Sequence, residues 1–248
     1  MSDFSPISEI FANPAFDPIP AGIRHGDLVH GLRLDGINPD TGEVPNDLEE
    51  QLFNAFENLR RSVENAGGNL DNVAQVSLFL DDPRSSMSAV NERWTALFPD
   101  ADNRPTYKFV PADLPENRVV ALEYFAVLGA TRQVINIENV AHTNPIPMGV
   151  RMGKYIFSSR VLPMDPQTGK YPPDVALQMD VLFGNLDAVL NAGGMTWSNI
   201  AQGRLFLADM DNLSAVQRRW AAQFSDTLAP PLHPLEYTAG PLLVMIEF

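Results

Sequence analysis

Apolar residues recur every three or four positions along two long stretches of the chain, with charged and amide residues between them. In both stretches the apolar positions fall on one stripe of a helix: Leu52, Phe56, Leu59 and Val63 in the first, and Met179, Phe183, Leu186 and Leu190 in the second. The opposite faces carry charged and amide residues, as is typical of a helix packed on a sheet. Asp47, with Glu50 three residues later, is predicted to cap the first helix. Gly-Gly pairs at 67–68 and 193–194 are predicted to end the two helices.

The two helices belong to one sequence pattern that occurs twice, at a lag of 127 residues. NPDTGEVPNDLEEQLFNAFENLRRSVENAGGNLDNVAQVSLFL begins at Asn38, and DPQTGKYPPDVALQMDVLFGNLDAVLNAGGMTWSNIAQGRLFL begins at Asp165. Each copy follows a Pro-Ile-Pro segment with a predicted hairpin, at 18–34 and 145–161. A repeat of about 125 residues is far longer than the roughly 20–50 residues of a solenoid repeat. The sequence therefore predicts two duplicated domains, residues 1–130 and 131–248. Residues 1–17 of the first domain are expected to be an irregular leader that ends in a short strand or arm.

Each copy is predicted to contain a hairpin, a helix, a strand, a second helix and two further strands. The predicted strands are short apolar runs, at 73–80, 107–111 and 119–127 in the first copy and at 200–207, 235–239 and 242–248 in the second. Trp94 and Trp220, at matching positions of the second helices, are expected in the core. Helices gathered on one face of a sheet give an α+β sandwich. The apolar residues of the other face are expected to be buried by self-association.

Composition and charge narrow the possible functions. The chain has 248 residues, no cysteine, and 31 acidic against 17 basic residues, for a net charge of −14. This acidic surface would repel a phosphate backbone, so we expect no nucleic-acid partner. No apolar run approaches the roughly 18 residues that span a bilayer, and the amino terminus lacks the features of a signal peptide. We expect a soluble cytoplasmic protein with no membrane partner. The four histidines show no metal-ligand spacing, and no metal or cofactor is expected.

Several features of the sequence carry a family resemblance. They are the DPxTG turn, the capped helix, the AGG stop, the strand that ends in Phe-Leu, and the last apolar strand with one glutamate. Both copies resemble the YjgF/UK114 family, also called RidA. The resemblance covers nearly the whole chain and implies a chorismate-mutase-like α+β fold. It also implies threefold rings with ligand clefts between neighbouring domains, which for a two-domain chain predicts a homo-oligomer of three chains and six domains. Family members hydrolyse reactive enamines and imines to oxo compounds and ammonia, or bind small metabolites.

The resemblance implies a site in which a cation holds the substrate carboxylate and a glutamate of the last strand handles a proton. The glutamate is kept as Glu123 and Glu247, but neither copy keeps the family's carboxylate-binding arginine. Thr106 or Tyr107 takes its position in the first copy, and His233 in the second. His233 is a candidate hydrogen-bonding residue or proton shuttle. For the glutamates, the alternative is a salt-bridged strand position.

Arginines repeated at the same lag could replace the missing cation. Arg33 and Arg160 fall at the glycine of the family's cleft-lining Ser-Gly-Gln segment, where a guanidinium could bind a carboxylate. Period-2 alternation argues against this, because Ser159 matches the cleft-facing serine. An interdomain salt bridge is the alternative for these arginines. We expect the working site in the second copy, where Glu247 and His233 are catalytic candidates and Arg160 and Ser159 bind substrate; Glu123, with Arg33, Thr106 and Tyr107, is the corresponding set in the first copy.

Three functions fit this sequence. The first is a deaminase acting on a small enamine or imine carboxylate, either 2-aminoacrylate-like or a dicarboxylate such as a 2-aminomuconate. The second is a metabolite-binding or interaction protein without catalysis, which the loss of the signature arginine favours. The third, the ribonuclease activity sometimes assigned to the family, is disfavoured by the acidic surface.

Overall fold

The computed structural model describes residues 4–6, 22–115, 117–224 and 228–248, and it divides into two compact units. The first unit runs to Gln133 and also includes Asn144–Ile146 and Arg151–Tyr155; the second contains Val134–Thr143, Pro147–Val150 and Ile156–Phe248. Most of the predicted leader lies outside the described residues. Each unit is described by itself below.

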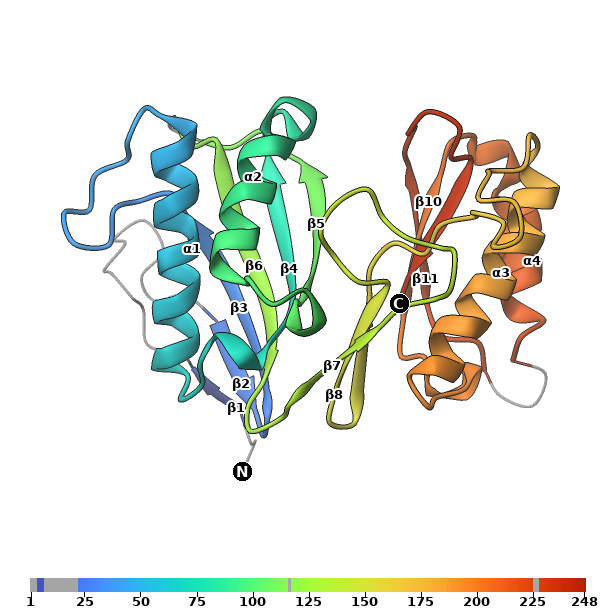
Figure 1. The fold of residues 1–248 in the computed structure, drawn as a ribbon, viewed down its shortest axis with the longest axis horizontal. Helices are drawn as coiled ribbons and strands as arrows, with labels where there is room; N and C mark the ends of the chain where they lie inside the picture. Colours follow the sequence, from blue (N-terminus) through green and yellow to red (C-terminus); the bar gives the residue numbers. More distant parts are fainter. Residues whose placement is uncertain (1–3, 7–21, 116, 225–227) are drawn as a thin grey trace. The chain divides into compact units, whose positions relative to one another are not determined.

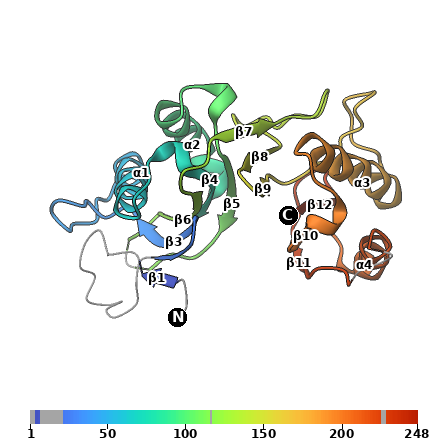
Figure 2. The ribbon, with the colours of Figure 1, turned by 90° about the horizontal axis from the view of Figure 1, so that it is seen from below.

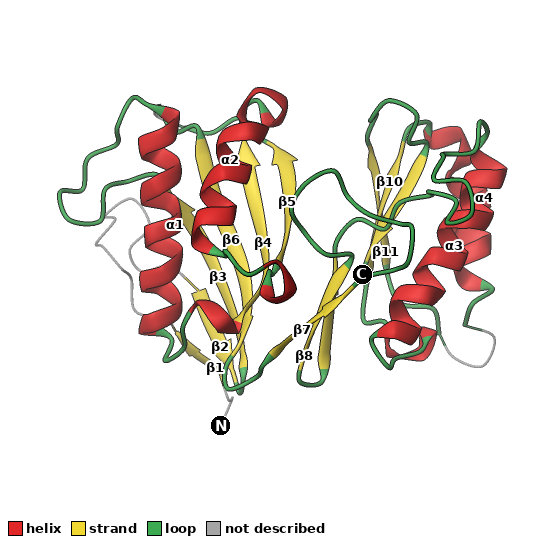
Figure 3. Ribbon diagram, viewed as in Figure 1, coloured by secondary structure: helices red, strands yellow, loops and turns green. Residues whose placement is uncertain are grey.

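The first unit contains one mixed sheet of six strands (Figures 1 and 3). Its strand order is β1-β2-β3-β6-β4-β5, with β1 Phe4–Pro6, β2 Gly22–His25, β3 Leu28–Asp35, β4 Val73–Leu80, β5 Thr106–Pro111 and β6 Val120–Val127. All neighbouring strands are antiparallel except β4 and β5, which are parallel. The predicted hairpin and the three later strands of the first copy are therefore confirmed.

Helices α1 (Leu48–Asn65) and α2 (Pro83–Leu97) cover one face of this sheet (Figure 2). The predicted cap is present, because the Asp47 carboxylate accepts a hydrogen bond from the amide of Glu50 at 3.0 Å. Trp94 is fully buried and packs against Phe56, Phe98 and Tyr107. Alternate residues of β4, β5 and β6 face this core, so the intervening residues lie on the opposite face, which we call the helix-free face.

The second unit repeats this arrangement with shorter strands. Strands β10 (Gly203–Leu207), β11 (Leu232–Glu236) and β12 (Val244–Glu247) form one sheet, in the order β11-β10-β12. Helices α3 (Val175–Ala192) and α4 (Leu213–Ala221) lie together on one side of it (Figure 1). A separate sheet, β7-β8-β9, contains β7 Arg132–Ile135, β8 Gly149–Met152 and β9 Tyr155–Ser158, and the division into units passes through all three strands. The long β3–β6 pairing of the first unit is reduced here to an isolated bridge between Val161 and Ile246.

Buried amide side chains make the same hydrogen bonds in both units. Asn58 Nδ2 donates to the carbonyls of Asp35 and Ile37, and Asn185 Nδ2 donates to those of Leu162 and Met164, all at 2.8–2.9 Å. Gln51 and Gln178 likewise bridge the chain before their helix to the segment before the last strand. The sequence pattern placed such amides on the outer faces of the helices, and that placement is wrong for these four. They are buried because they satisfy backbone groups that would otherwise lack partners.

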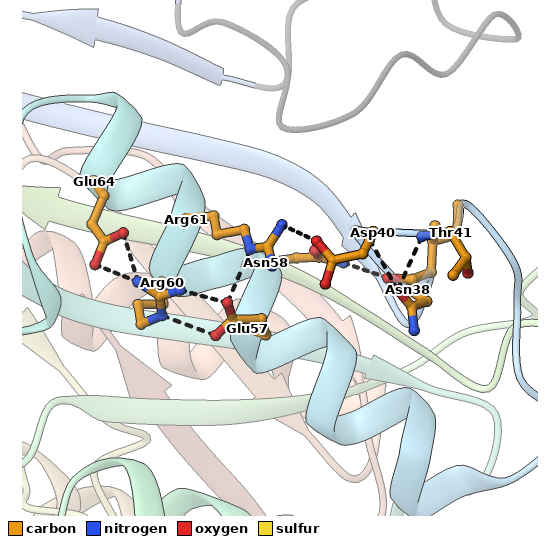
Figure 4. Close-up of polar contacts among 9 residues, drawn as sticks. Asn38, Asp40, Thr41, Glu57, Asn58, Arg60, Arg61 and Glu64 are labelled. Atoms are coloured by element: carbon orange, nitrogen blue, oxygen red, sulfur yellow. Dashed lines mark hydrogen bonds and ion pairs between the residues drawn. The ribbon is translucent and has the colours of Figure 1, made fainter.

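The outer surfaces of α1 and α3 differ strongly. On α1, Arg60 bonds to both Glu57 and Glu64, and Arg61 joins Glu57 to Asp40 of the DPxTG turn (Figure 4). Hydrogen bonds from Arg60 lower the pKa of Glu57 to about 2. At the matching positions of α3 the chain has Gly184 for Glu57 and Ala188 for Arg61. The second helix therefore lacks the counterparts of Glu57 and Arg61 in this cluster of ion pairs.

Candidate functional site

A row of three side chains crosses the helix-free face of the first unit. Ser77 on β4 pairs with Glu123 on β6 on one side and with Lys108 on β5 on the other. We call Glu123, Ser77 and Lys108 the first row. Since neighbouring strands lie about 4.8 Å apart, the backbone positions of Glu123 and Lys108 are about 10 Å apart. The first row thus places an acid and a cation on one face with a small hydroxyl between them.

The Glu123 carboxylate lies beside a histidine and is partly exposed to solvent. Its side chain is 24% exposed, and its Oε2 lies 4.0 Å from Nε2 of His30 on β3. The His30 ring stacks on Phe125 at 4.2 Å between ring centres. Burial lowers the pKa of His30, the Glu123 charge opposes this effect, and the Lys108 charge adds to it. The histidine is therefore held mainly neutral near pH 7.

The Lys108 ammonium group is the first donor in a series of three hydrogen bonds, which hold it in position. Lys108 Nζ donates to Oε1 of Gln75 at 3.3 Å, and Gln75 Nε2 donates to the Thr106 hydroxyl at 3.4 Å. Thr106 in turn donates to the carbonyl of Ala74 at 3.5 Å. All three side chains are buried. Sequence analysis selected Thr106 but not Lys108, which the parallel register of β4 and β5 places on the same face.

The other residues selected in the first copy do not lie in this row. Tyr107 faces the opposite side of the sheet, where it is buried against Trp94 and its hydroxyl donates to Asn91. Burial raises its pKa, as expected for a core phenol. Arg33 lies in β3, but its side chain is outside the described part of the structure. Thr106 and Glu123 are therefore the two sequence-predicted residues that the first unit brings onto one face.

The second unit contains an equivalent row with different residues. Arg204 on β10 pairs with Glu247 on β12 and with His233 on β11. We call Glu247, Arg204 and His233 the second row. Because the register is the same, Arg204 occupies the place of Ser77, and His233 occupies the place of Lys108 rather than that of Thr106 or Tyr107. In the first row the cation Lys108 lies on the edge strand β5. In the second row the cation Arg204 lies on the central strand β10, next to Glu247.

Glu247 is engaged by that cation. Arg204 Nη1 donates to Glu247 Oε1 at 2.7 Å, and the Glu247 side chain is only 6% exposed. Arg160 Nε lies 3.9 Å from Oε2 of the same carboxylate. The Arg160 guanidinium also stacks on Phe206 and Tyr237, at 4.0 and 4.8 Å from the ring centres. This contact of Arg160 lies within its own unit, whereas the alternative expected from the sequence was an interdomain salt bridge.

Ser159, selected as the cleft serine, is paired with a histidine that the sequence pattern did not single out. Its Oγ donates to the carbonyl of Met148 at 2.9 Å and lies 2.6 Å from Nε2 of His142. With its only proton given to the carbonyl, the hydroxyl accepts a hydrogen bond from the imidazole. Burial, aided by the Arg160 charge, lowers the pKa of His142 to about 4. His233, by contrast, is exposed on the edge strand.

Among the described residues, no group of three or more His, Asp or Glu side chains is placed to hold a metal ion. In the same part of the chain, no helix is both long and apolar enough to cross a membrane.

The sequence of this chain matches a known protein family twice, once in each copy of the repeat. The family described as Endoribonuclease L-PSP matches residues 21–128 and again residues 137–241. The chain belongs to this family. It is a tandem member with two α+β domains of the RidA type, as the sequence resemblance predicted.

Curated relatives match one copy of this RidA-type chain. The 2-iminobutanoate/2-iminopropanoate deaminase of Escherichia coli K12 is 30% identical over 95 residues, which is 38% of this chain and 74% of the relative. A RutC family protein of Aquifex aeolicus is 31% identical over 93 residues, covering 37% of this chain and 74% of the relative. Imine deaminases are therefore among its homologues.

Solved structures of the family match half of the chain. The YjgF gene product from E. coli is 27% identical with a TM-score of 0.45, and covers 50% of this chain and 98% of its own. A putative endoribonuclease from Thermotoga maritima is 28% identical with a TM-score of 0.44, and covers 50% and 96%.

Proposed function

We propose that this chain hydrolyses a small imine or enamine that carries a carboxylate, and that the first unit carries the reaction. The overall change adds water across the C=N bond, releasing a 2-oxo acid and ammonia; an enamine first takes a proton on carbon to become the imine. The named activity of the E. coli relative supports this class of reaction. The single observation that carries the choice of unit is the Glu123 carboxylate, which is partly exposed and is separated from Lys108 by Ser77 in the first row.

In this proposal each member of the first row has one role. Lys108 binds the substrate carboxylate, taking over from the arginine that the sequence lacks, and the bonded Gln75 and Thr106 hold its ammonium in place. Glu123 accepts a proton as water attacks the iminium carbon. A neutral His30 beside it does not form a full ion pair with Glu123, so the carboxylate remains available as a base.

The choice of the first unit departs from the sequence-based preference for Glu247, His233, Arg160 and Ser159. That preference stays a prediction. Against it stand the contacts of the second row, because a nearly buried Glu247 that accepts from Arg204 at 2.7 Å is poorly placed to take a proton from water.

Ammonia release tests the proposed activity. Imines generated enzymatically from amino acids, together with ring-opened aminoaromatic acids of the 2-aminomuconate class, would be offered to wild type and to a Glu123→Gln/Glu247→Gln double variant. We expect wild type to release ammonia at least ~10²-fold faster than the double variant. Equal rates on every substrate would contradict hydrolysis and favour the second candidate, a metabolite-binding protein without catalysis. That candidate is supported by the ion-paired Glu247 and by the loss of the family's arginine from both copies.

A ribonuclease function is not supported by the charge of the molecule. A net charge of −14 opposes a phosphate backbone at all but short range. Tight RNA binding near 0.15 M salt would contradict this.

We further propose that the protein assembles as three chains that supply six domains. Light scattering after size exclusion should give about 82 kDa, three times the chain mass of 27.3 kDa. A stable species at the mass of one chain would contradict the assembly.

A further inference from the structure

We propose that Arg204 closes the site of the second unit by holding Glu247 in an ion pair, so that the second unit neither binds nor hydrolyses the substrate of the first. This inference rests on the proposed function of the first row. Arg204 is then the residue that makes the two copies of one fold unequal.

Position within the sheet is the first argument. Arg204 and Ser77 lie at the same point of their central strands, each flanked by a glutamate of the last strand and by a residue of the parallel edge strand. In the first unit this point carries a small side chain that separates acid from cation. In the second unit it carries the cation itself. The arginine at the centre of the row therefore lies next to the glutamate, whereas in the first row the cation and the glutamate are separated by Ser77.

Contact geometry is the second argument. The Arg204–Glu247 bond of 2.7 Å is short for a nitrogen–oxygen hydrogen bond, as expected for one between charged groups. Glu247 is 6% exposed, whereas the Arg204 side chain is 35% exposed, so the guanidinium lies on the solvent side of the carboxylate. Water that approaches Glu247 from this face meets Arg204 first. Glu123 in the first row is 24% exposed, and among the side chains that the structure describes Ser77, at the place of Arg204, is too small to cover it.

Competition for the cation is the third argument. A substrate carboxylate that took the Nη1 donor of Arg204 would displace Glu247, leaving that carboxylate nearly buried without its main partner. Separating one partner from a buried ion pair is costly, because the remaining charge is no longer compensated. The second row therefore disfavours the ligand class that the first row accommodates. Arg160 does not change this, since its guanidinium is held against Phe206 and Tyr237.

Removing Arg204 should open the second site. In a Glu123→Gln background, which silences the first row, Arg204→Ser supplies the residue that the first unit has at this point. We expect ammonia release at least ~10-fold above that of Glu123→Gln alone, with His233 left to receive the carboxylate. Arg219→Ser in the same background is the matched control, because Arg219 lies on α4 and pairs with Asp180 of α3. It should release no more ammonia than Glu123→Gln alone.

A binding measurement separates this inference from the proposed function. Calorimetric titration with 2-oxobutanoate should give one site per chain in wild type and two in Arg204→Ser. If no protein releases ammonia but the stoichiometry rises from one to two, the hydrolysis proposal fails and the closing role of Arg204 stands. If wild type is active, while Arg204→Ser is folded, binds one equivalent and adds no activity in the Glu123→Gln background, the closing role fails and the hydrolysis proposal stands.

The remaining outcomes are also decisive. Two equivalents bound by wild type, or none bound by wild type and Arg204→Ser alike, would overturn the inference. Arg204→Gln, which keeps a neutral donor for Glu247, replaces Arg204→Ser if the latter does not fold. Unfolding of both variants would assign Arg204 to folding alone and would equally overturn it.

Discussion

The two units share their scaffold and differ in the row that crosses the helix-free face. Both cap the first helix with an aspartate, and in both a buried glutamine and a buried asparagine of that helix bond to the chain before it. The same register in both sheets then carries Glu123, Ser77 and Lys108 in one and Glu247, Arg204 and His233 in the other. The two units therefore share their pattern of backbone hydrogen bonds and differ in the side chains of this row. A duplicated fold is therefore no guarantee of a duplicated site.

After the loss of Glu123 itself, replacement of Lys108 should have the largest effect on the activity of the first unit. Lys108→Met should raise KM roughly 10- to 100-fold with a smaller change in kcat, because hydrogen bonds to charged groups contribute about 1.5–3 kcal/mol. Lys108→Arg keeps the charge and should retain most of the affinity. Steady-state ammonia release gives both constants. An unchanged KM in Lys108→Met would remove Lys108 from the site.

A pH effect is expected in the second unit. His142 has its pKa lowered to about 4, so the folded state binds fewer protons than the unfolded state between about pH 4 and pH 6.5. Stability is thus fully present above pH 6.5 and falls as the pH drops towards 4, by at most about 3 kcal/mol. Urea unfolding followed by the fluorescence of Trp197 and Trp220 measures it. His142→Gln should flatten the dependence, and an unchanged slope in that variant would contradict the assignment.

The smallest effect concerns the outer face of α3. Gly184 stands mid-helix where α1 has Glu57, and a Cβ there would meet no atom within 4 Å. Gly184→Ala should stabilise the second unit by about 0.5–1 kcal/mol, because alanine loses less backbone freedom in a helix. Gly193→Ala is the contrasting variant: its Cβ would lie 2.2 Å from Ile156 Cδ1, so it should destabilise. Thermal unfolding of both variants decides, and equal shifts would contradict the account.

Most of the fold could be predicted from the sequence, since periodicity and turn residues are local properties. The stripe of Leu52, Phe56 and Leu59, the Asp47 cap and the burial of Trp94 are found as expected. Strand β7 was not anticipated, and the separate β7-β8-β9 sheet departs from the predicted repeat of one hairpin per domain. Its pairing is non-local, and a sequence pattern carries little information on such contacts.

The candidate site was only partly predictable, because a row across strands depends on register. Glu123 and Glu247 stood out as acids in apolar strands. Lys108 and Arg204 did not, since an isolated basic residue on a strand resembles any solvated position. Alternation could have placed Lys108 on the face of Thr106. Only the pairing of β10 with both of its neighbours shows that Arg204 meets Glu247.

The most direct test of the central claim compares Glu123→Gln with Glu247→Gln on one confirmed substrate. If the first unit carries the hydrolysis, Glu123→Gln should cost at least ~10²-fold in turnover. Glu247→Gln should change turnover by less than about threefold, a difference too small for the loss of a general base. Its main effect should be a lower unfolding temperature, because Arg204 and Arg160 lose a charged partner. The reverse order of the two turnover rates would place the reaction in the second unit and contradict the account.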